Sequence, residues 1–169
     1  MERRSLRGTI KEHILLLKGD SAGMEITRHF TATTFVVYGD KTLLHRHVKL
    51  DMWLPPGGHI DRDELPHVAA KREVLEETGL EVEIIHAEPT IFSENAQEIP
   101  GPRHLLLENI NPFHQHIDMI YFARASSFEV NPRSHESQTL KWFTHTDLER
   151  REIENDIRIL GQEAIRVLT

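Results

Sequence analysis

Three glutamates crowd one short stretch of the chain, at positions 73, 76 and 77 within KREVLEETGL. On a helix this spacing places Glu73, Glu76 and Glu77 on one face, because residues three and four apart lie one above the other. Like charges at this spacing destabilise an isolated helix by about 0.2–0.5 kcal/mol per pair. The position near the helix C-terminus adds to the cost, since the macrodipole there disfavours anions. Converging carboxylates suit a hard divalent cation, whose charge reverses the repulsion.

Two neighbouring features favour a metal site over the more common solvated charged face. Gly57 and Gly58 precede the segment, and glycine lets a backbone carbonyl approach an ion closely. Arg72 stands directly before the glutamates and can hold Glu73 or Glu76 in place through a charge-assisted hydrogen bond. The residues therefore predict a site for Mg²⁺, with Mn²⁺ as a substitute, on one face of a helix.

The segment GHIDRDELPHVAAKREVLEETGL, residues 58 to 80, resembles the Nudix box. Gly58 is followed after five residues by Glu64, and after seven more by Arg72 and the glutamate-rich stretch. The resemblance implies a Nudix-type α/β/α sandwich with a mixed sheet, in which the box forms a loop, a helix and a loop. It also implies a metal-dependent hydrolase that cleaves the diphosphate (phosphoanhydride) bond of a nucleoside diphosphate linked to another small moiety.

The resemblance also implies roles for individual residues. Glu73, Glu76 and Glu77 would bind the metal, and the main-chain carbonyl near Gly57 would complete its shell. Arg72 would orient the glutamates, so these four side chains form the expected catalytic set.

Three further positions of the box carry expected structural roles. Gly58 and Gly79 would shape the loops before and after the helix. Glu64 would support the metal ligands without binding the metal itself.

The expected reaction is attack of water at phosphorus, with metal ions lowering the pKa of that water and a glutamate accepting its proton. The base is either a glutamate of the box or one from a later loop, and the residues leave both open. The loop candidates are Glu94, Glu98 and Glu108, with Glu136 ahead of the predicted strand TLKWF.

Basic and imidazole side chains near the box are candidates for contacts with substrate, namely Arg46, Lys49 and His116. The segment HQHID leads into an apolar strand, so His116 and Asp118 are predicted to edge the active-site cleft. A carboxylate inside an apolar strand is unusual. We expect Asp118 to reach a structural partner such as His116 or Arg124, and the alternative is that it faces the metal site.

The chain contains twelve histidines. The pairs His45 with His47 and His114 with His116 are each separated by two residues, so each pair is predicted to share one face of a strand. A zinc site would need a third ligand, and the spacing places none. Surface positions or contacts with phosphate are therefore favoured over zinc for these side chains.

The elements that must position this site follow from apolar periodicity and turn residues. Phe35 to Val37 and Thr42 to Val48 predict a hairpin around the turn Gly39-Asp40, and Pro55 to Gly58 predicts a loop. Pro66 at the start and Gly79 past the end predict the box helix over 66 to 78. The other predicted elements are helices at 2–18 and 155–168, strands at 80–85, 117–123 and 139–143, and a mostly loop segment at 86–112 with at most a short strand at 105–107.

Length and composition limit the class of protein. The 169 residues predict one domain, divided as an N-terminal helical extension at 1–29, a core at 30–147 and a C-terminal helix at 148–169. A formal net charge of −7 argues against sequence-independent binding of duplex nucleic acid. No stretch reaches the ~18 apolar residues that span a bilayer, so no membrane association is expected. Absence of cysteine excludes disulfides and thiolate catalysis, and we expect a cytoplasmic monomer or homodimer.

Two rival functions share the resemblance. A prenyl diphosphate isomerase with this fold would use a nucleophilic cysteine, and the chain has none. A non-catalytic domain that senses a nucleotide and regulates a partner is the remaining alternative. Such domains commonly lose glutamates of the box, whereas all are present here. The sequence therefore favours a nucleotide-type diphosphate as substrate and does not identify its leaving group.

Overall fold

The computed structural model describes residues 25–169, so the helix predicted at about 2 to 18 lies outside the described residues. The two α-helices are α2 (Pro66–Thr78) and α3 (Asn155–Leu168), with a short 3₁₀ helix η1 (Asp147–Glu149) before α3. The strands are β1 (Thr27–Tyr38), β2 (Lys41–Arg46), β3 (Trp53–Leu54), β4 (Gly57–His59), β5 (Val82–Ile84), β6 (His104–Asn111), β7 (His114–Ala125) and β8 (Leu140–Thr144).

The described strands form one mixed, eight-stranded sheet. Its main path runs in the order β3-β2-β1-β7-β5, with β4 paired to β1, β6 to β7 and β8 to β2. The two long strands β1 and β7 run parallel, and the other pairs are antiparallel. The mixed sheet between helices confirms the predicted α/β architecture.

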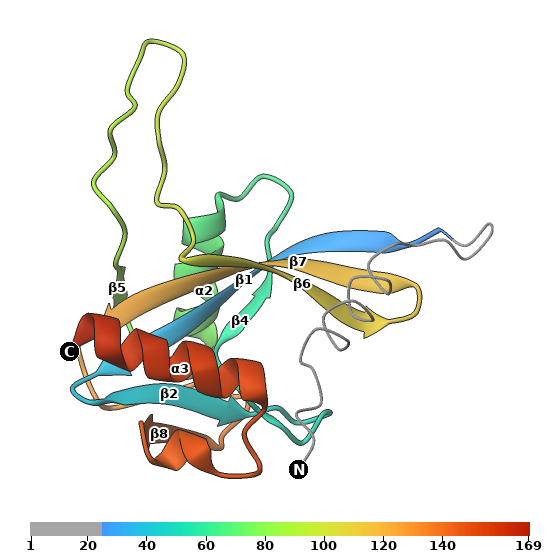
Figure 1. Ribbon diagram of the computed structural model, residues 1–169, viewed down its shortest axis with the longest axis vertical. Helices are drawn as coiled ribbons and strands as arrows, with labels where there is room; N and C mark the ends of the chain where they lie inside the picture. The colour runs from blue at the N-terminus through green and yellow to red at the C-terminus, as the bar shows by residue number, and fades with distance from the viewer. Residues whose placement is uncertain (1–24) are drawn as a thin grey trace, which may run out of the picture.

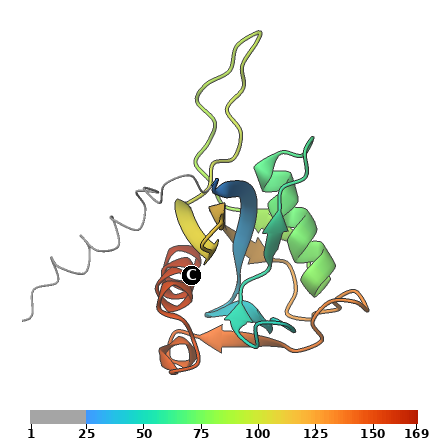
Figure 2. The ribbon, with the colours of Figure 1, turned by 90° about the vertical axis from the view of Figure 1, so that its right-hand side faces the viewer.

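The two helices cover opposite faces of this sheet (Figures 1 and 2). On one face, Ala69 and Ala70 of α2 pack against Ala32 and Tyr121, so small side chains let the helix approach the strands closely. The other face carries the larger core, to which α3 contributes an apolar stripe. This core consists of Phe35, Val37, Leu44, Ile120, Phe122, Phe143, Leu148, Ile153, Ile157, Leu160, Ala164, Ile165 and Leu168.

The box helix begins and ends where the sequence predicts. Pro66 lies in its first turn, where its missing N–H costs no helical hydrogen bond. Gly79 follows its last residue with a φ of 74°, and its N–H donates to the carbonyl of Leu75. The predicted hairpin is also confirmed, with Val37 opposite Thr42 and Gly39 in the left-handed turn.

The segment at 86–112 differs from the prediction. Its second half forms β6, eight residues that pair antiparallel with β7, instead of a loop with a short strand. Leu105 and Leu107 point outward and remain 61% and 40% exposed. Because apolar residues also occupy the solvent side of β6, its sequence does not show the alternation of apolar and polar residues that usually marks a strand. The first half projects from the body as a long loop (Figure 1).

Two smaller differences concern β1 and the glycine loop. β1 begins at Thr27, earlier than the strand predicted around Phe35, because it pairs with β7 from Thr27 to Val37. Gly57 and Gly58 were predicted as loop and form β4, paired to β1. A Cβ on Gly57 would lie 2.8 Å from the carbonyl oxygen of Ala32, so only glycine permits this close pairing.

Within residues 25–169, none of the helices is both long enough and apolar enough to cross a membrane.

Candidate active site

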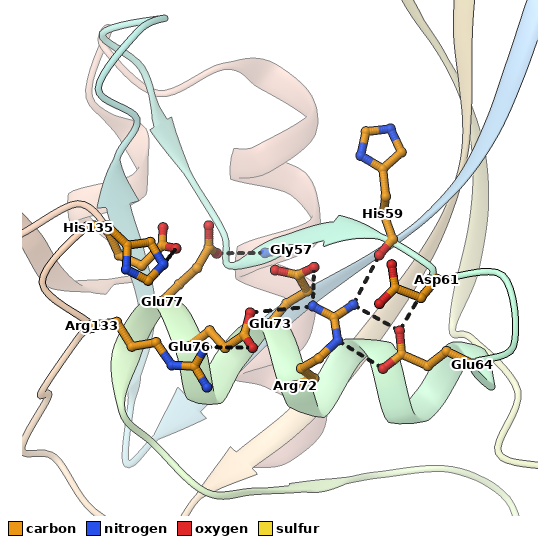
Figure 3. A network of polar contacts seen from close by, with 11 residues as sticks. Gly57, His59, Asp61, Glu64, Arg72, Glu73, Glu76, Glu77, Arg133 and His135 are labelled. Atoms are coloured by element: carbon orange, nitrogen blue, oxygen red, sulfur yellow. Dashed lines mark hydrogen bonds and ion pairs between the residues drawn. The ribbon is translucent and has the colours of Figure 1, made fainter.

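Helix α2 presents its glutamates to the glycine strand β4 (Figure 3). The side that packs on the sheet is made of small or branched residues, of which Val74 and Thr78 are fully buried. The glutamates lie on the flank of the helix that faces β4, as the i, i+3, i+4 spacing requires. The carboxylates of Glu73, Glu76 and Glu77 therefore gather beside one backbone segment.

Glu77 is the glutamate held by the backbone. One oxygen of its carboxylate accepts a 2.9 Å hydrogen bond from the N–H of Gly57, and its side chain is 13% exposed. The same oxygen lies 3.8 Å from Nε2 of His45, on β2. The pKa of His45 is lowered to about 4, mainly by burial and in smaller part by the charge of His47. The imidazole of His45 is therefore neutral at pH 7, and its contact with Glu77 is not an ion pair.

Arg72 ties the box together, as expected for an orienting residue. Its guanidinium donates to both carboxylate oxygens of Glu64, each at 2.9 Å, and to Glu73 at 2.7 Å. It also donates to the carbonyl of His59 at 3.1 Å and, at 3.5 Å, to Glu76. Arg72 thus holds Glu73 in place, and Glu64 holds Arg72.

Glu76 has a second partner that the sequence did not indicate. Its other carboxylate oxygen lies 2.8 Å from Nη1 of Arg133, in the segment between β7 and β8. The N–H of Arg133 also donates to the main-chain oxygen of Glu76. Arg133 follows a proline in an irregular stretch, so no periodic pattern could have identified it.

Two of the three carboxylates have a raised pKa. The pKa of Glu77 is raised to about 8, mainly by burial and in smaller part by the charges of Glu73, Glu136 and Glu76, against the opposing effect of the N–H of Gly57. Burial is also the main cause that raises the pKa of Glu73, with Arg72 opposing it. Burial, with the neighbouring carboxylates, therefore opposes the ionised form of Glu77 when no cation is bound.

This donor set fits a divalent cation. The site offers hard carboxylate oxygens, which Mg²⁺ and Mn²⁺ prefer. The most buried of the three carboxylates, that of Glu77, accepts a hydrogen bond from a backbone N–H and has a neutral imidazole 3.8 Å away, so neither neighbour supplies a positive charge. A Cβ on Gly58 would lie 2.5 Å from an oxygen of Glu73, so this glycine keeps the space beside the carboxylate open.

A cavity of about 370 Å³ adjoins the glutamates. Glu77, Gly57 and Gly58 form one end of its lining, and the first turn of α3 contributes Asp156 and Ile157. Its size falls within the range of small-molecule sites. The rest of the lining is half apolar and half polar. The apolar residues are Phe35, Leu50, Leu54, Pro55, Leu106, Ile110, Ile120 and Leu160, and the polar ones are Thr31, Thr33, His45, His47, His59, Glu108, His116 and Asp118.

A sequence model of the NUDIX domain matches residues 27–162. The chain belongs to the Nudix family. It is a hydrolase of that family, whose members cleave diphosphate bonds and generally use divalent metals. No curated protein sequence matches the chain.

Solved structures of other Nudix proteins share the fold. A hydrolase of the NUDIX family from Clostridium perfringens is 37% identical, with a TM-score of 0.76 over 85% of this chain and 100% of that one. An Ap4A hydrolase from C. elegans is 21% identical, with a TM-score of 0.58 over 83% of this chain and 94% of that one. A UDP-X diphosphatase is 21% identical, with a TM-score of 0.54 over 94% of this chain and 68% of that one.

The candidates for a general base outside the Nudix box separate into two groups. Glu94 and Glu98 are exposed in the projecting loop, where Glu98 accepts hydrogen bonds from the N–H groups of Thr90 and Ile91. Glu108 lies on β6, not on a loop, and lines the cavity. Glu136 is close enough to raise the pKa of both Glu73 and Glu77. The structure thus brings Glu108 and Glu136 to the site.

Asp118 is buried on β7 and has a partner other than those predicted. It accepts a 2.9 Å hydrogen bond from Oγ1 of Thr31 on β1, and not one from His116 or Arg124. The parallel register of β1 and β7 places Thr31 directly beside Asp118. Asp118 also lines the cavity, so it lies at the cleft edge as expected.

Of the three residues predicted to contact substrate, one lines the cavity and two lie outside its lining. His116 lines the cavity. Arg46 lies on β2 outside the lining, and its Nε pairs with Asp51 at 2.8 Å. Lys49 is exposed in the turn between β2 and β3 and is also outside the lining. The roles of Arg46 and Lys49 in binding substrate stay predictions.

We expect Glu108 to make stability depend on pH. Burial, followed by the charges of Asp118 and Asp156, raises its pKa from 4.5 to about 7. Between these values the folded protein keeps a proton that the unfolded chain has lost, so this group's contribution to stability falls as pH rises through the window. Glu108→Gln removes this titrating group. The Tm of the variant minus the Tm of wild type should therefore increase as the pH rises from about 5 to about 8.

The measurement is thermal unfolding of both proteins across that pH range, with exposed Glu83 as a control position through Glu83→Gln. A difference in Tm between Glu108→Gln and wild type that stays constant with pH would contradict the assignment.

Proposed function

We propose that this Nudix protein is a metal-dependent hydrolase that cleaves the diphosphate bond of a nucleoside diphosphate linked to another small moiety. One observation carries the proposal: Glu77 belongs both to the carboxylate cluster and to the lining of the cavity. A diphosphate at the glutamates would therefore leave the rest of the substrate in a cavity lined by both apolar and polar side chains. The shape and lining suit a nucleoside, which combines an apolar ring with polar edges.

The residues of the chain would divide the work of the proposed reaction. When bound, Mg²⁺ or Mn²⁺ neutralises the diphosphate and makes an attacking water more acidic. Glu73, Glu76 and Glu77 would hold the cation, with the backbone near Gly57 beside them. Arg72 would keep Glu73 in one rotamer through its 2.7 Å hydrogen bond, so that little reorganisation is needed during reaction.

Two carboxylates beside the proposed metal site are candidates for the base, and Glu108 in the cavity lining is a third. Glu77 has a pKa of about 8 without metal, and Glu136 lies close enough to contribute to that value. A base works best when its pKa lies near the pH of the reaction. Replacement of Glu136 by Gln tests the choice: a proton acceptor would lower kcat, whereas a residue that only adds charge would change metal affinity.

The first experiment is a turnover screen with and without Mg²⁺ on a panel of diphosphates. The panel contains ADP-ribose, dinucleoside polyphosphates, nucleotide sugars, and ordinary and oxidised nucleoside triphosphates. We expect metal-dependent turnover of at least one class, abolished by a chelator and restored by adding Mg²⁺ or Mn²⁺ back. Tight nucleotide binding without turnover of any compound, with either metal, would contradict the proposal and support a sensing role. A cytoplasmic location and the choice between monomer and homodimer stay predictions.

A further inference from the structure

Four imidazoles gather on the sheet, two of them in the lining of the cavity, and the proposed hydrolysis does not use them as a group. His29 comes from β1, His59 from β4, and His114 and His116 from β7. Their rings form a continuous series, with centroids 4.6 Å apart for His29 and His114, 5.2 Å for His29 and His59, and 5.0 Å for His59 and His116. We call these four residues the histidine cluster.

Strand register explains why the cluster forms. On β1, His29 and Thr31 share one face, because side chains alternate along a strand. His59 pairs with Thr31 across β1 and β4, and His29 pairs with His116 across β1 and β7. His114 lies two residues before His116 and therefore shares its face. Three strands thus bring the histidines to the same face of the sheet.

Three members of the cluster converge with the geometry of metal ligands. One ring nitrogen from each of His29, His59 and His114 lies within 4.8 Å of the others. Nδ1 of His29 is 3.3 Å from Nε2 of His59. A tetrahedral ion with bonds of about 2.0–2.1 Å to nitrogen separates its ligand atoms by about 3.3–3.4 Å. Rotation of the His114 side chain would bring the third nitrogen to the same spacing.

The cluster is chemically distinct from the glutamate site. Figure 3 shows the ring of His59 pointing away from the box glutamates, while its carbonyl accepts from Arg72. The cluster offers imidazole nitrogens, which suit Zn²⁺ and neighbouring transition metals, whereas the box offers carboxylate oxygens, which suit Mg²⁺. Among the described residues, the one carboxylate within 4.0 Å of a ring nitrogen of the cluster is that of Glu108, which contacts Nδ1 of His116.

The alternative explanation is a hydrogen bond between two neutral imidazoles. That bond explains the single approach of His29 and His59 at 3.3 Å. It does not account for His114, whose ring nitrogen also lies close to the other two. His29 and His59 are exposed, so each could form a hydrogen bond with water instead. A common metal ion accounts for all three nitrogens at once.

We propose that His29, His59 and His114 form a binding site for a divalent transition metal, with Zn²⁺ as its expected occupant, separate from the Mg²⁺ site of the Nudix box. Three imidazoles leave the fourth tetrahedral position to water. The inference does not depend on the proposed hydrolysis, since metal binding is measured without substrate.

The test titrates Zn²⁺ into the full chain, produced without a polyhistidine tag and saturated with Mg²⁺, and measures affinity by competition with a chromophoric chelator. We expect the double variant His29→Asn/His114→Asn to bind Zn²⁺ at least about tenfold more weakly than wild type. The control His86→Asn/His145→Asn makes the same two chemical changes at exposed histidines outside the cluster and should bind like wild type. Circular dichroism and Tm of each metal-free variant establish that it is folded.

A second readout separates the two sites. Co²⁺ in place of Zn²⁺ should give the strong visible absorption of a four-coordinate ion in wild type and in Glu77→Gln, and should lose it in His29→Asn/His114→Asn. Equal Zn²⁺ affinity in wild type and in the histidine double variant would overturn the proposal. So would loss of the Co²⁺ spectrum in Glu77→Gln with retention in the histidine variant, which would assign the ion to the glutamates.

Discussion

Glu77→Gln should lower kcat by about 100-fold or more on any diphosphate that the protein hydrolyses. A 100-fold loss corresponds to about 2.7 kcal/mol of transition-state stabilisation. The amide keeps an oxygen that can accept from the N–H of Gly57, so the local backbone should be retained. It removes the negative charge that would hold the cation in the cavity, and it can no longer take a proton.

The comparison needs a variant with the same chemical change outside the site. Glu83→Gln on β5 replaces an exposed glutamate and should leave kcat and KM unchanged. Steady-state rates at saturating Mg²⁺, together with Tm, separate loss of catalysis from loss of folding. Wild-type turnover by folded Glu77→Gln would remove this residue from the catalytic set.

Gly79→Ala should destabilise the protein by at least about 2 kcal/mol, the largest effect on stability that we expect from a single methyl group. Gly79 has a φ of +74°, a left-handed conformation that costs other residues about 1–2 kcal/mol. In addition, its Cβ would collide with the backbone of Asn131, which packs directly against the end of α2. Since the collision is with backbone, it cannot be relieved by a side-chain rotation.

The chain provides a matched control for this prediction at Gly39. Gly39 has a φ of +57° and nothing within 4 Å of the position of a Cβ. Gly39→Ala therefore measures the backbone strain alone, and Gly79→Ala measures strain plus collision. Urea unfolding with equal m-values should show Gly79→Ala to be the more destabilised of the two. Equal losses of stability would mean that the contact with Asn131 relaxes without cost.

The shape of the box helix and the grouping of its glutamates could be predicted from the sequence because both are local. Pro66 and Gly79 mark the ends of α2 through their own backbone preferences. Glu73, Glu76 and Glu77 share a face through helical geometry alone. The role of Arg72 as a partner of Glu73 follows in the same way, since they are adjacent in the chain.

The remaining features of the site join residues that are far apart in the chain. The bonds from Thr31 to Asp118 and from Arg133 to Glu76 span 87 and 57 residues. The sequence contains no signal for either, because a shift in strand register would give each residue a different neighbour. For the same reason Asp118 was predicted to bind residues near it in the chain, and its actual partner lies on the adjacent strand.

The sequence by itself determined the family, the box helix and the carboxylate chemistry, since these depend on contacts within a few residues. Only the tertiary structure decided that β1 and β7 pair in parallel over their full length, that β6 is a strand, and that the histidines of three strands meet. Sequence spacing could place His114 beside His116 but could not bring ligands from other strands. His29 and His59 meet His114 because β1 pairs with both β4 and β7, and that pairing joins residues far apart in the chain.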